Sequence, residues 1–318
     1  MNVLVLGGDG FLGSHMVDRL LSMGHGVTVF DRFPGDAPQR VGRHGDRIRL
    51  VRGEFGATPE LREALAGQDL VYHFISATTP GSSWGNPAVE IDRNLRPTLE
   101  FLKLATGAGI RKIAFPSSGG TVYGYEGANR LLTEDVAARP VTPYGIVKLA
   151  IEGFLSHLGE SAGIACDIYR IGNAYGPGQP TRGSQGVIGI WLEKIRRGEA
   201  IEIYGDSTTL RDFVYVEDIA WLMSMSLIDL GASGLYNLGT GRGVSPPGLA
   251  DILRRVIPVP FGLVFRDKRG FDGASAVLDS SRLLARCPGF SFTRLEDGIM
   301  AAWRAMGDPN ADRRGDGV

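Results

Sequence analysis

Short apolar segments alternate with amphipathic stretches through the first half of the chain. The apolar segments predict buried strands at residues 3–6, 27–31, 48–51, 70–75, 112–116 and 165–170. Apolar positions with helical spacing predict helices at residues 11–23, 59–66, 87–108 and 144–161. We expect Pro97 to kink or interrupt the third of these helices. Strands alternating with helices predict an α/β fold, a doubly wound parallel sheet covered on both faces.

The pattern loosens after Gly172. Strands are expected at residues 201–204 and 235–238, and helices at residues 186–197, 216–228, 246–256 and 294–306. We expect residues 1–172 to form the larger domain, with part of the later chain returning to its sheet, and residues 173–306 to form mainly a smaller C-terminal α/β substrate lobe. The polar, aperiodic residues 307–318 are expected to be a disordered tail.

Composition excludes several classes of function. The 318 residues carry 34 Lys and Arg against 35 Asp and Glu, so no basic field is available for a nucleic acid or a membrane surface. No apolar run approaches the roughly 20 residues that span a bilayer, and the N-terminus lacks the features of an export signal. Cys166 and Cys287 lie in no metal-binding pattern and are expected to be reduced thiols. We expect a cytoplasmic protein without a metal site.

The first predicted strand runs into a glycine-rich turn and then a helix. This turn is Gly7-Gly8-Asp9-Gly10-Phe11-Leu12-Gly13, and the second strand ends at Asp31, 18 residues beyond Gly13. Glycines let the backbone approach a pyrophosphate at the helix N-terminus, and an acid about 20 residues later accepts hydrogen bonds from the adenine ribose. The pattern indicates a Rossmann-type site. Asp31 favours NAD over NADP because it would repel a 2′-phosphate, and Arg32 would stack on the adenine or lie in solvent. The alternative is a turn that merely packs helix on strand.

Tyr144 and Lys148 follow Pro143, which is well placed at the start of a helix. Their spacing of four residues puts both side chains on one helix face. A fixed ammonium near a phenol favours the phenolate and lowers the pKa of the phenol. Such a pair can remove a proton from an alcohol as hydride leaves the carbon. The alternative is a tyrosine that faces the core and a lysine that faces solvent.

These motifs together resemble the extended short-chain dehydrogenase/reductase superfamily, and in particular its NAD-dependent nucleotide-sugar epimerase/dehydratase branch. The similarity extends over nearly the whole chain, including residues 73–77, 117–124, 170–177, 204–206 and 211–218. The resemblance implies catalytic roles for Tyr144 and Lys148. It implies that the cofactor contacts Gly7, Gly10, Phe11, Leu12, Gly13, Asp31, Arg32, Phe74, Ser76, Ala77, Asn94, Ser117, Tyr144 and Lys148. It implies that the substrate contacts Asn173, Arg211, Arg269 and Ala276, with the two arginines on its pyrophosphate.

One position departs from the pattern of this superfamily. Gly119 occurs where a Ser or Thr usually supplies a hydroxyl to the reacting oxygen. Ser118 or Thr121 could reach the same oxygen, because the chemistry requires only a donor and acceptor at ~2.6–3.2 Å. Residues 120 and 121 are not acidic, although dehydratases and decarboxylases of the branch typically carry acidic residues there. The small Ala276 would leave room for N-acetylated or otherwise bulkier hexoses.

The resemblance implies NAD-dependent epimerisation at C4 of a nucleotide-diphosphate sugar, most of all a UDP-hexose, through a transient 4-keto sugar. An alternative is a nucleotide-sugar 4-ketoreductase or dehydratase of deoxysugar or antibiotic biosynthesis. A second alternative, encouraged by Gly119, is a non-catalytic NAD-binding sensor. Homodimerisation through the helices predicted at residues 87–108 and 144–161 is a further implication, although apolar faces there could equally belong to the core.

Overall fold

A seven-stranded parallel sheet forms the larger part of the protein. The computed structural model describes residues 1–307 except 36, 125–129, 184–185, 205–208 and 268–274. The strands lie in the order β10-β6-β5-β4-β1-β2-β3. Their bounds are β1 Asn2–Leu6, β2 Gly26–Asp31, β3 Ile48–Arg52, β4 Leu70–His73, β5 Lys112–Ser118, β6 Ala165–Ile171 and β10 Gly234–Leu238. The order reverses between β1 and β4, which is where open α/β sheets bind their ligands.

Helices cover both faces of the large sheet, as the alternating pattern predicts. One face packs on α1 (Phe11–Ser22), α8 (Val216–Met223) and α10 (Ser281–Leu284). The other face packs on α2 (Pro59–Leu65), α4 (Arg96–Thr106) and α6 (Pro143–Ala162). Two separate apolar clusters, one on each face, fill these layers. The predicted doubly wound α/β fold is confirmed.

The helix expected at residues 87–108 is interrupted. It begins as α3 (Ala88–Glu90), continues as a π-helical turn, η2 (Ile91–Leu95), and only then becomes α4. Pro97 lies in the first turn of α4, directly after the π-helical turn. Pro97 cannot donate to a carbonyl in the preceding turn, which agrees with the expected interruption.

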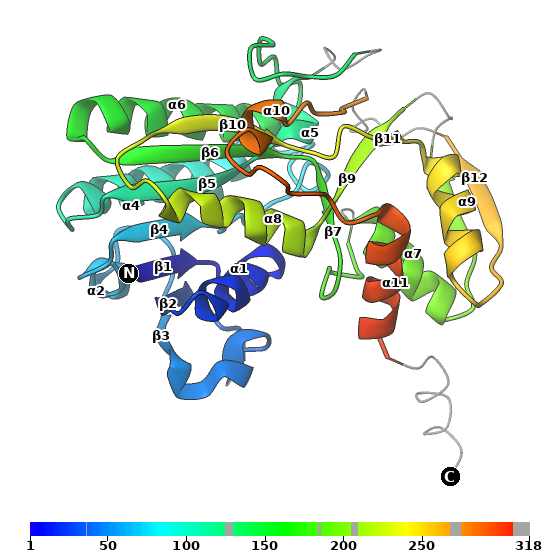
Figure 1. Cartoon of the computed structure of the whole chain (residues 1–318), viewed down its shortest axis with the longest axis horizontal. Coiled ribbons are helices and arrows are strands. Elements are labelled where there is room, and N and C mark those ends of the chain that lie inside the picture. The colour runs from blue at the N-terminus through cyan, green and yellow to red at the C-terminus, as the bar shows by residue number, and fades with distance from the viewer. Residues whose placement is uncertain (36, 125–129, 184–185, 205–208, 268–274, 308–318) are drawn as a thin grey trace.

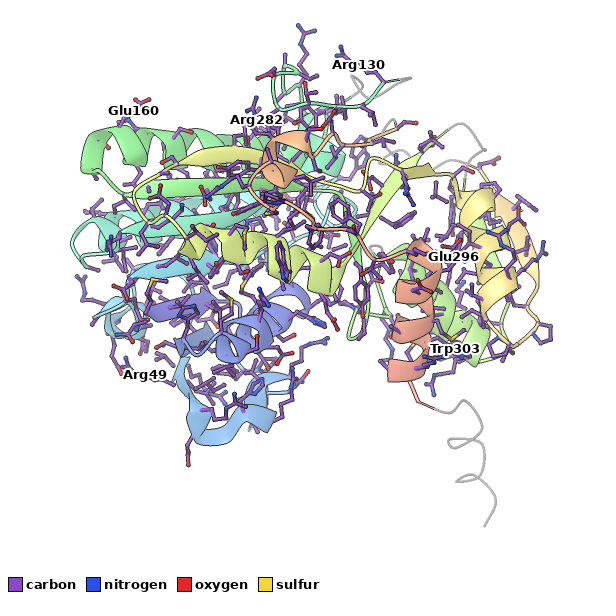
Figure 2. The ribbon with its side chains drawn as sticks, in the orientation of Figure 1. Arg49, Arg130, Glu160, Arg282, Glu296 and Trp303 are labelled. Atoms are coloured by element: carbon purple, nitrogen blue, oxygen red, sulfur yellow. The ribbon has the colours of Figure 1, made fainter. Side chains whose placement is uncertain are left out.

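A smaller lobe lies to the right of the large sheet in Figure 1. It contains a three-stranded sheet of β7 (Asn173–Tyr175), β9 (Arg211–Tyr215) and β11 (Gly243–Val244), and a pair formed by β8 (Ile201–Tyr204) and β12 (Leu263–Arg266). The helices α7 (Val187–Arg196), α9 (Pro246–Val256) and α11 (Leu295–Ala305) share one apolar core with these strands. Trp303 of α11 belongs to this core (Figure 2).

The chain crosses between the two parts several times. After β9 in the small lobe, α8 packs on the large sheet and β10 pairs in parallel with β6. The strand expected at residues 235–238 therefore belongs to the large sheet. The helix expected at residues 216–228 consists of two pieces, α8 and the 3-10 turn η3 (Ser224–Leu227). The domain boundaries at residues 172 and 306 stay predictions, and the expected tail after Gly307 lies outside the described residues.

The remaining short elements are η1 (Val41–Arg47), a 3-10 segment after β2, and α5 (Gly119–Val122), which follows β5 directly. Within the described part of the chain, none of the helices has the length and apolar character needed to cross a membrane.

Candidate active site

The glycine turn between β1 and α1 is built too tightly for side chains. Gly7 has a φ of +75°, a conformation that favours glycine. A Cβ atom on Gly13 would lie 2.2 Å from the carbonyl oxygen of Gly7, and one on Gly8 would lie 2.7 Å from a methyl carbon of Val29. No side chain caps the N-terminus of α1, where Gly10 is the N-cap residue. The turn therefore leaves the first N–H groups of α1 open to an anionic ligand.

Asp31 stands at the end of β2 beside this turn. Its Oδ2 accepts the N–H of Asp9 at 3.0 Å, and its Oδ1 accepts the N–H of Arg32 at 2.8 Å. Burial raises the pKa of the Asp31 carboxyl, and the two backbone hydrogen bonds oppose that effect. Each oxygen keeps a lone pair for a further donor, as the binding of a ribose diol requires. The side chain of Arg32 is exposed.

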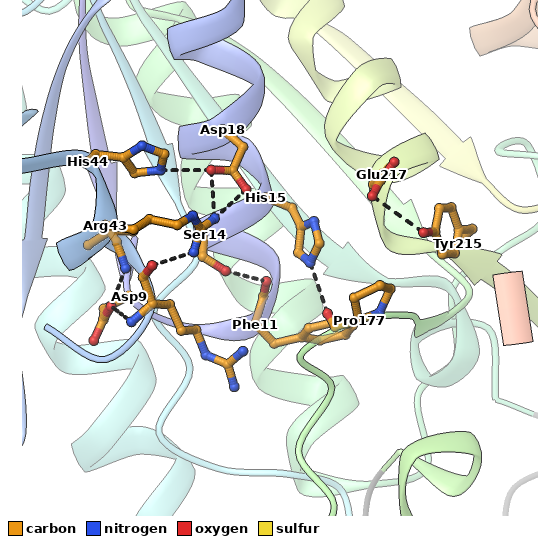
Figure 3. Close-up of polar contacts among 12 residues, drawn as sticks. Asp9, Phe11, Ser14, His15, Asp18, Arg43, His44, Pro177, Tyr215 and Glu217 are labelled. Atoms are coloured by element: carbon orange, nitrogen blue, oxygen red, sulfur yellow. Dashed lines mark hydrogen bonds and ion pairs between the residues drawn. The ribbon is translucent and has the colours of Figure 1, made fainter. Parts of the chain in front are cut away.

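Asp9, inside the glycine motif, organises the segment after β2. Its carboxylate accepts the backbone N–H groups of Gln39, Arg40 and Val41 at 2.7–3.0 Å. Figure 3 shows this carboxylate at the start of α1, and His15 of the same helix bonded to the carbonyl of Pro177 at 2.9 Å. The motif predicts only the glycines, so the clamp made by Asp9 was missed. A carboxylate inside the turn was the available signal.

The segment after β4 connects the glycine turn to the predicted catalytic residues. A Cβ atom on Gly7 would lie 3.0 Å from the backbone nitrogen of Ile75. Phe74 is half-buried, and Ser76 and Ala77 are exposed. The N–H of Ala77 donates to Oδ1 of Asn94 at 2.8 Å. Asn94 therefore holds this segment in place, and the structure brings together all four residues predicted here for the cofactor.

Tyr144 and Lys148 lie on one face of α6, as their spacing predicts. Thr142 caps this helix by accepting the N–H of Gly145 at 3.1 Å. Both predicted catalytic side chains line a small cavity with Ile75, Ser76, Glu90 and Asn94. The Lys148 Nζ donates to the carbonyl of Pro116 at 3.0 Å and lies 4.5 Å from the centre of the Phe115 ring. The alternative of a solvent-facing lysine is thus wrong, since Lys148 is 7% exposed.

Burial is the largest influence on the pKa values of Tyr144 and Lys148. It raises the pKa of Tyr144 to about 12, although a hydrogen bond with Ser76 acts in the opposite direction. It lowers the pKa of Lys148 to about 8, against the nearby carboxylates of Glu90 and Glu152. The expected lowering of the phenol pKa by Lys148 is therefore not the dominant effect in this structure. The Lys148 ammonium lies 5.6 Å from the centre of the Tyr144 ring.

The carboxyl end of β5 carries the predicted hydroxyl groups. The Oγ of Ser117 donates to Glu152, so this side chain is directed into the interior. Ser118 is half-buried at the junction of β5 and α5. Thr121 of α5 has a buried Oγ1 with no hydrogen-bond partner within the described chain. An unpaired buried hydroxyl is costly, which makes Thr121 the better candidate for a donor to a bound sugar.

The packing around Gly119 leaves no space for a side chain at this position. A Cβ atom there would lie 2.5 Å from Cδ1 of Leu278 and 3.0 Å from the carbonyl oxygen of Arg170. Leu278 therefore occupies the space that a side chain at position 119 would need. A Cβ atom on Gly120 would meet nothing within 4 Å.

The predicted substrate residues lie at the edge of the small lobe. Asn173 begins β7, and its Nδ2 donates to the carbonyl of Asp212 at 3.3 Å. Arg211 begins β9 and pairs by an isolated parallel bridge with Ala276. The bridge makes Arg211 and Ala276 neighbours, and Ala276 is buried in an apolar cluster that includes Val122. Arg269 lies outside the described residues.

Comparison with known proteins identifies the family of the chain. Residues 3–239 match the sequence profile described as the NAD dependent epimerase/dehydratase family. The chain belongs to this family. Among curated members, the UDP-glucose 4-epimerase of Mycolicibacterium smegmatis is 29% identical, over 89% of this chain and 91% of that protein. A dTDP-4-dehydro-6-deoxyglucose reductase of Escherichia coli is 27% identical, over 93% of this chain and 95% of the other.

Solved structures from the family have the same fold. A UDP-glucose 4-epimerase of Thermotoga maritima, crystallised with UDP-glucose, superposes with a TM-score of 0.88 and 29% identity, covering 96% of this chain and 98% of the other. The Thermus thermophilus UDP-glucose 4-epimerase, in complex with NAD, gives a TM-score of 0.87 and 28% identity, covering 96% and 99%.

The residues of this chain fit the NAD of the family name. Side chains are excluded from Gly8 and Gly13 by contacts under 3 Å, and the start of α1 has no side-chain cap. Asp31 lies beside that turn with lone pairs for a ribose. Together these features form a cradle for a pyrophosphate and the adjoining nucleoside.

Proposed function

We propose that the protein interconverts the C4 epimers of a UDP-hexose and keeps NAD bound through the cycle. One observation carries this proposal: Tyr144 and Lys148 line a cavity with Ile75, whose backbone touches the glycine turn at Gly7. A proton-transfer pair and a dinucleotide cradle are thus joined through Ile75. The UDP-sugar epimerases at 28–29% identity over 96% of the chain support the substrate class.

The residues divide the reaction between them. The glycine turn and Asp31 would hold NAD, which would supply a hydride acceptor and donor for C4 of the sugar. The phenolate form of Tyr144 accepts the proton of the 4-hydroxyl as hydride leaves C4, and the phenol so formed gives the proton back after the sugar has turned. Thr121 or Ser118 orients the reacting oxygen, and Lys148 supplies the positive charge near the phenol. Arg211, with Arg269, would hold the pyrophosphate while the 4-keto sugar rotates, because a guanidinium binds phosphate oxygens in pairs.

A proton NMR experiment on UDP-glucose and UDP-galactose tests the proposal. The purified protein, without added reductant, should convert each sugar into an equilibrium mixture of both. Stoichiometric consumption of NADH or NADPH with a 4-keto sugar would instead favour the reductase, an alternative supported by the Escherichia coli relative. Binding of NAD without turnover of any UDP- or dTDP-sugar would favour the sensor.

The N-acetylated sugars are a narrower part of this proposal. Ala276 is small and lies beside Arg211, and an N-acetyl group would need space next to the pyrophosphate-binding residues. We expect the protein to convert UDP-N-acetylglucosamine as well, and Ala276→Tyr to lose that activity selectively. Equal loss for both sugars would remove this idea.

We also propose a homodimer through the helices that cover one face of the sheet. Ile146 and Phe154 of α6 and Ile91 of η2 are exposed by 53%, 42% and 48%. Large apolar side chains on adjacent helices suit a symmetric interface. Light scattering should give twice the chain mass, and Phe154→Glu should give a monomer.

Both buried cysteines are unpaired, which supports a reducing compartment such as the cytoplasm.

A further inference from the structure

The cavity beneath Tyr144 contains a carboxylate that the proposed reaction does not use. Glu90 is the last residue of α3 and is 1% exposed. Its Oε2 accepts a hydrogen bond from Nδ2 of Asn94 at 2.8 Å. Its Oε1 is buried and has no hydrogen-bond partner in the described part of the chain. A buried carboxylate oxygen without a partner is costly, so its retention calls for a physical explanation.

The surrounding structure fixes Glu90 rather than leaving it adaptable. The π-helical turn η2 starts directly after Glu90 and includes Asn94. Asn94 bonds Glu90 on one side, and on the other it bonds the N–H of Ala77 and the hydroxyl of Thr78 at 2.8 and 2.7 Å. Turns of this kind occur often at functional sites. Glu90 is therefore coupled to the segment that also borders the dinucleotide cradle.

The titratable groups around Glu90 come from two elements, α6 and β4. α6 contributes Tyr144 and Lys148 to the cavity. Glu152, also on α6, is engaged by Arg170 at 2.7 Å and by Ser117. β4 contributes His73, whose pKa burial lowers to about 3, so the ring is neutral. Of the residues that line the cavity, only Glu90 supplies a negative charge with an unshared oxygen.

A carboxylate at this place acts on both members of the catalytic pair. It favours the ammonium form of Lys148, and it disfavours the phenolate form of Tyr144. Burial alone would push Lys148 toward the neutral amine. A neutral amine could no longer supply the positive charge that the phenol needs during proton transfer.

We propose that Glu90 is a positioning residue of the active site, whose fixed carboxylate keeps the Lys148 side chain a charged ammonium at neutral pH. The role rests on the proposed function of the Tyr144 and Lys148 pair, but its direct consequence is electrostatic and can be measured without a sugar. Glu90 would then act through Lys148 and would not touch the substrate.

The test is the titration of Lys148 in protein loaded with NAD. The chain has five lysines, so ¹³Cε-lysine NMR resolves the Lys148 signal, which Lys148→Met assigns. Glu90→Gln keeps an oxygen for Asn94 but removes the charge. We expect it to lower the Lys148 titration midpoint by on the order of one pH unit, and to move the pH profile of kcat in the acidic direction.

Two variants separate charge from structure. Glu90→Asp keeps the charge and should leave the Lys148 midpoint near that of the unaltered protein. Asp92→Asn removes one negative charge two residues away, where the side chain is 63% exposed and pairs with Arg96, and should leave the midpoint unchanged. A midpoint unmoved by Glu90→Gln, or lowered equally by Glu90→Asp, would overturn the proposal even if UDP-sugars are epimerised. A lowered midpoint in a protein that turns over no sugar would support the role of Glu90 and reject the proposed function.

Discussion

A buried lysine lies near each end of β5, and the two ammonium groups differ in how many of their hydrogen-bond donors have partners. At the amino end, Lys112 is fully buried and forms an ion pair with Asp167 at 2.8 Å. It also donates to the carbonyls of Asp229 and Ala232 at 2.7 and 2.8 Å. All three donors of this ammonium have partners.

At the carboxyl end of β5, Lys148 of α6 donates to the carbonyl of Pro116 and lies over an aromatic ring. Within the described residues that carbonyl is its one hydrogen-bond acceptor. Burial accordingly lowers its pKa to about 8. Unpaired groups nearby include Oε1 of Glu90 and Oγ1 of Thr121.

The difference concerns the two ammonium groups: the donors of Lys112 are all used, although Oδ1 of its partner Asp167 has no hydrogen-bond partner within the described residues, whereas Lys148 has donors left over. The connections that precede the parallel strands can close around Lys112, whereas the carboxyl ends of the strands face the site. A charged group that is satisfied internally stabilises the fold and has nothing left for a ligand. A charged group with donors left over costs stability and is available for chemistry.

Removing the Tyr144 hydroxyl should have the largest effect. Tyr144→Phe should lower kcat about 10³-fold, the usual contribution of a positioned acid and base, while NAD binding and melting temperature stay unchanged. Steady-state rates with UDP-galactose measure this. Tyr72→Phe is the matched control, because its buried hydroxyl bonds the carbonyl of Met223 at 3.0 Å. It should cost about 1 kcal/mol of stability and leave kcat intact. A Tyr144→Phe protein with kcat within tenfold of the original would show that the Tyr144 hydroxyl does not transfer the proton.

Replacing each lysine by Met tests the contrast directly. Lys112→Met leaves Asp167 unpaired in the core, so we expect a loss of about 3–5 kcal/mol in the free energy of unfolding. Lys148→Met removes a poorly satisfied charge and should not lower that free energy, while greatly reducing kcat. Urea denaturation compares the two variants. Equal losses of stability would mean that the two lysines do not differ in the way described.

A substitution in the glycine turn at the carboxyl end of β1 should have a smaller effect on stability. Gly13→Ala would place its Cβ atom 2.2 Å from the carbonyl of Gly7, against backbone that cannot move aside. We expect a loss of roughly 1–3 kcal/mol in stability and weaker binding of NAD, measured by calorimetry. Gly153 lies inside α6, and a Cβ atom there would meet nothing within 4 Å. Gly153→Ala should therefore stabilise the protein by about 0.5–1 kcal/mol and leave NAD binding unchanged. Similar effects of both substitutions would argue against a steric role for Gly13.

The sequence predicted the features that depend on local spacing. Strand, glycine turn, helix and Asp31 follow one another within 31 residues, and Tyr144 and Lys148 are one helical turn apart. These relations need no knowledge of distant contacts. The three residues of β7 and the two of β11, in contrast, are too short to show a period, and both were missed.

Features that depend on tertiary packing could not be predicted in this way. Glu90 belongs to no motif, and it is buried where α3 and η2 pack against α6, a helix much later in the chain. Leu278 fills the space beside Gly119 from 159 residues away. The pKa of Tyr144 shows the same limit: the spacing to Lys148 predicts a lower value, but the burial that raises it depends on the whole fold.

The dependence of stability on pH gives the finest test of the contrast. The pKa of Lys148 is about 8 in the folded protein against 10.5 for the ordinary side chain, so between these values the unfolded chain binds more protons. Stability therefore increases with pH across that window, by up to about 1.4 kcal/mol for each pH unit from this group. Tyr144 acts in the opposite direction, since its pKa is raised from 10 to about 12, but only above its ordinary value. Between about pH 8 and about pH 10, the difference in unfolding free energy between Lys148→Met and the original protein should thus shift in favour of the original protein. Urea denaturation at several pH values measures this shift. A difference that stays constant with pH would mean that Lys148 has the same proton affinity in the folded and unfolded states, and is as well satisfied as Lys112.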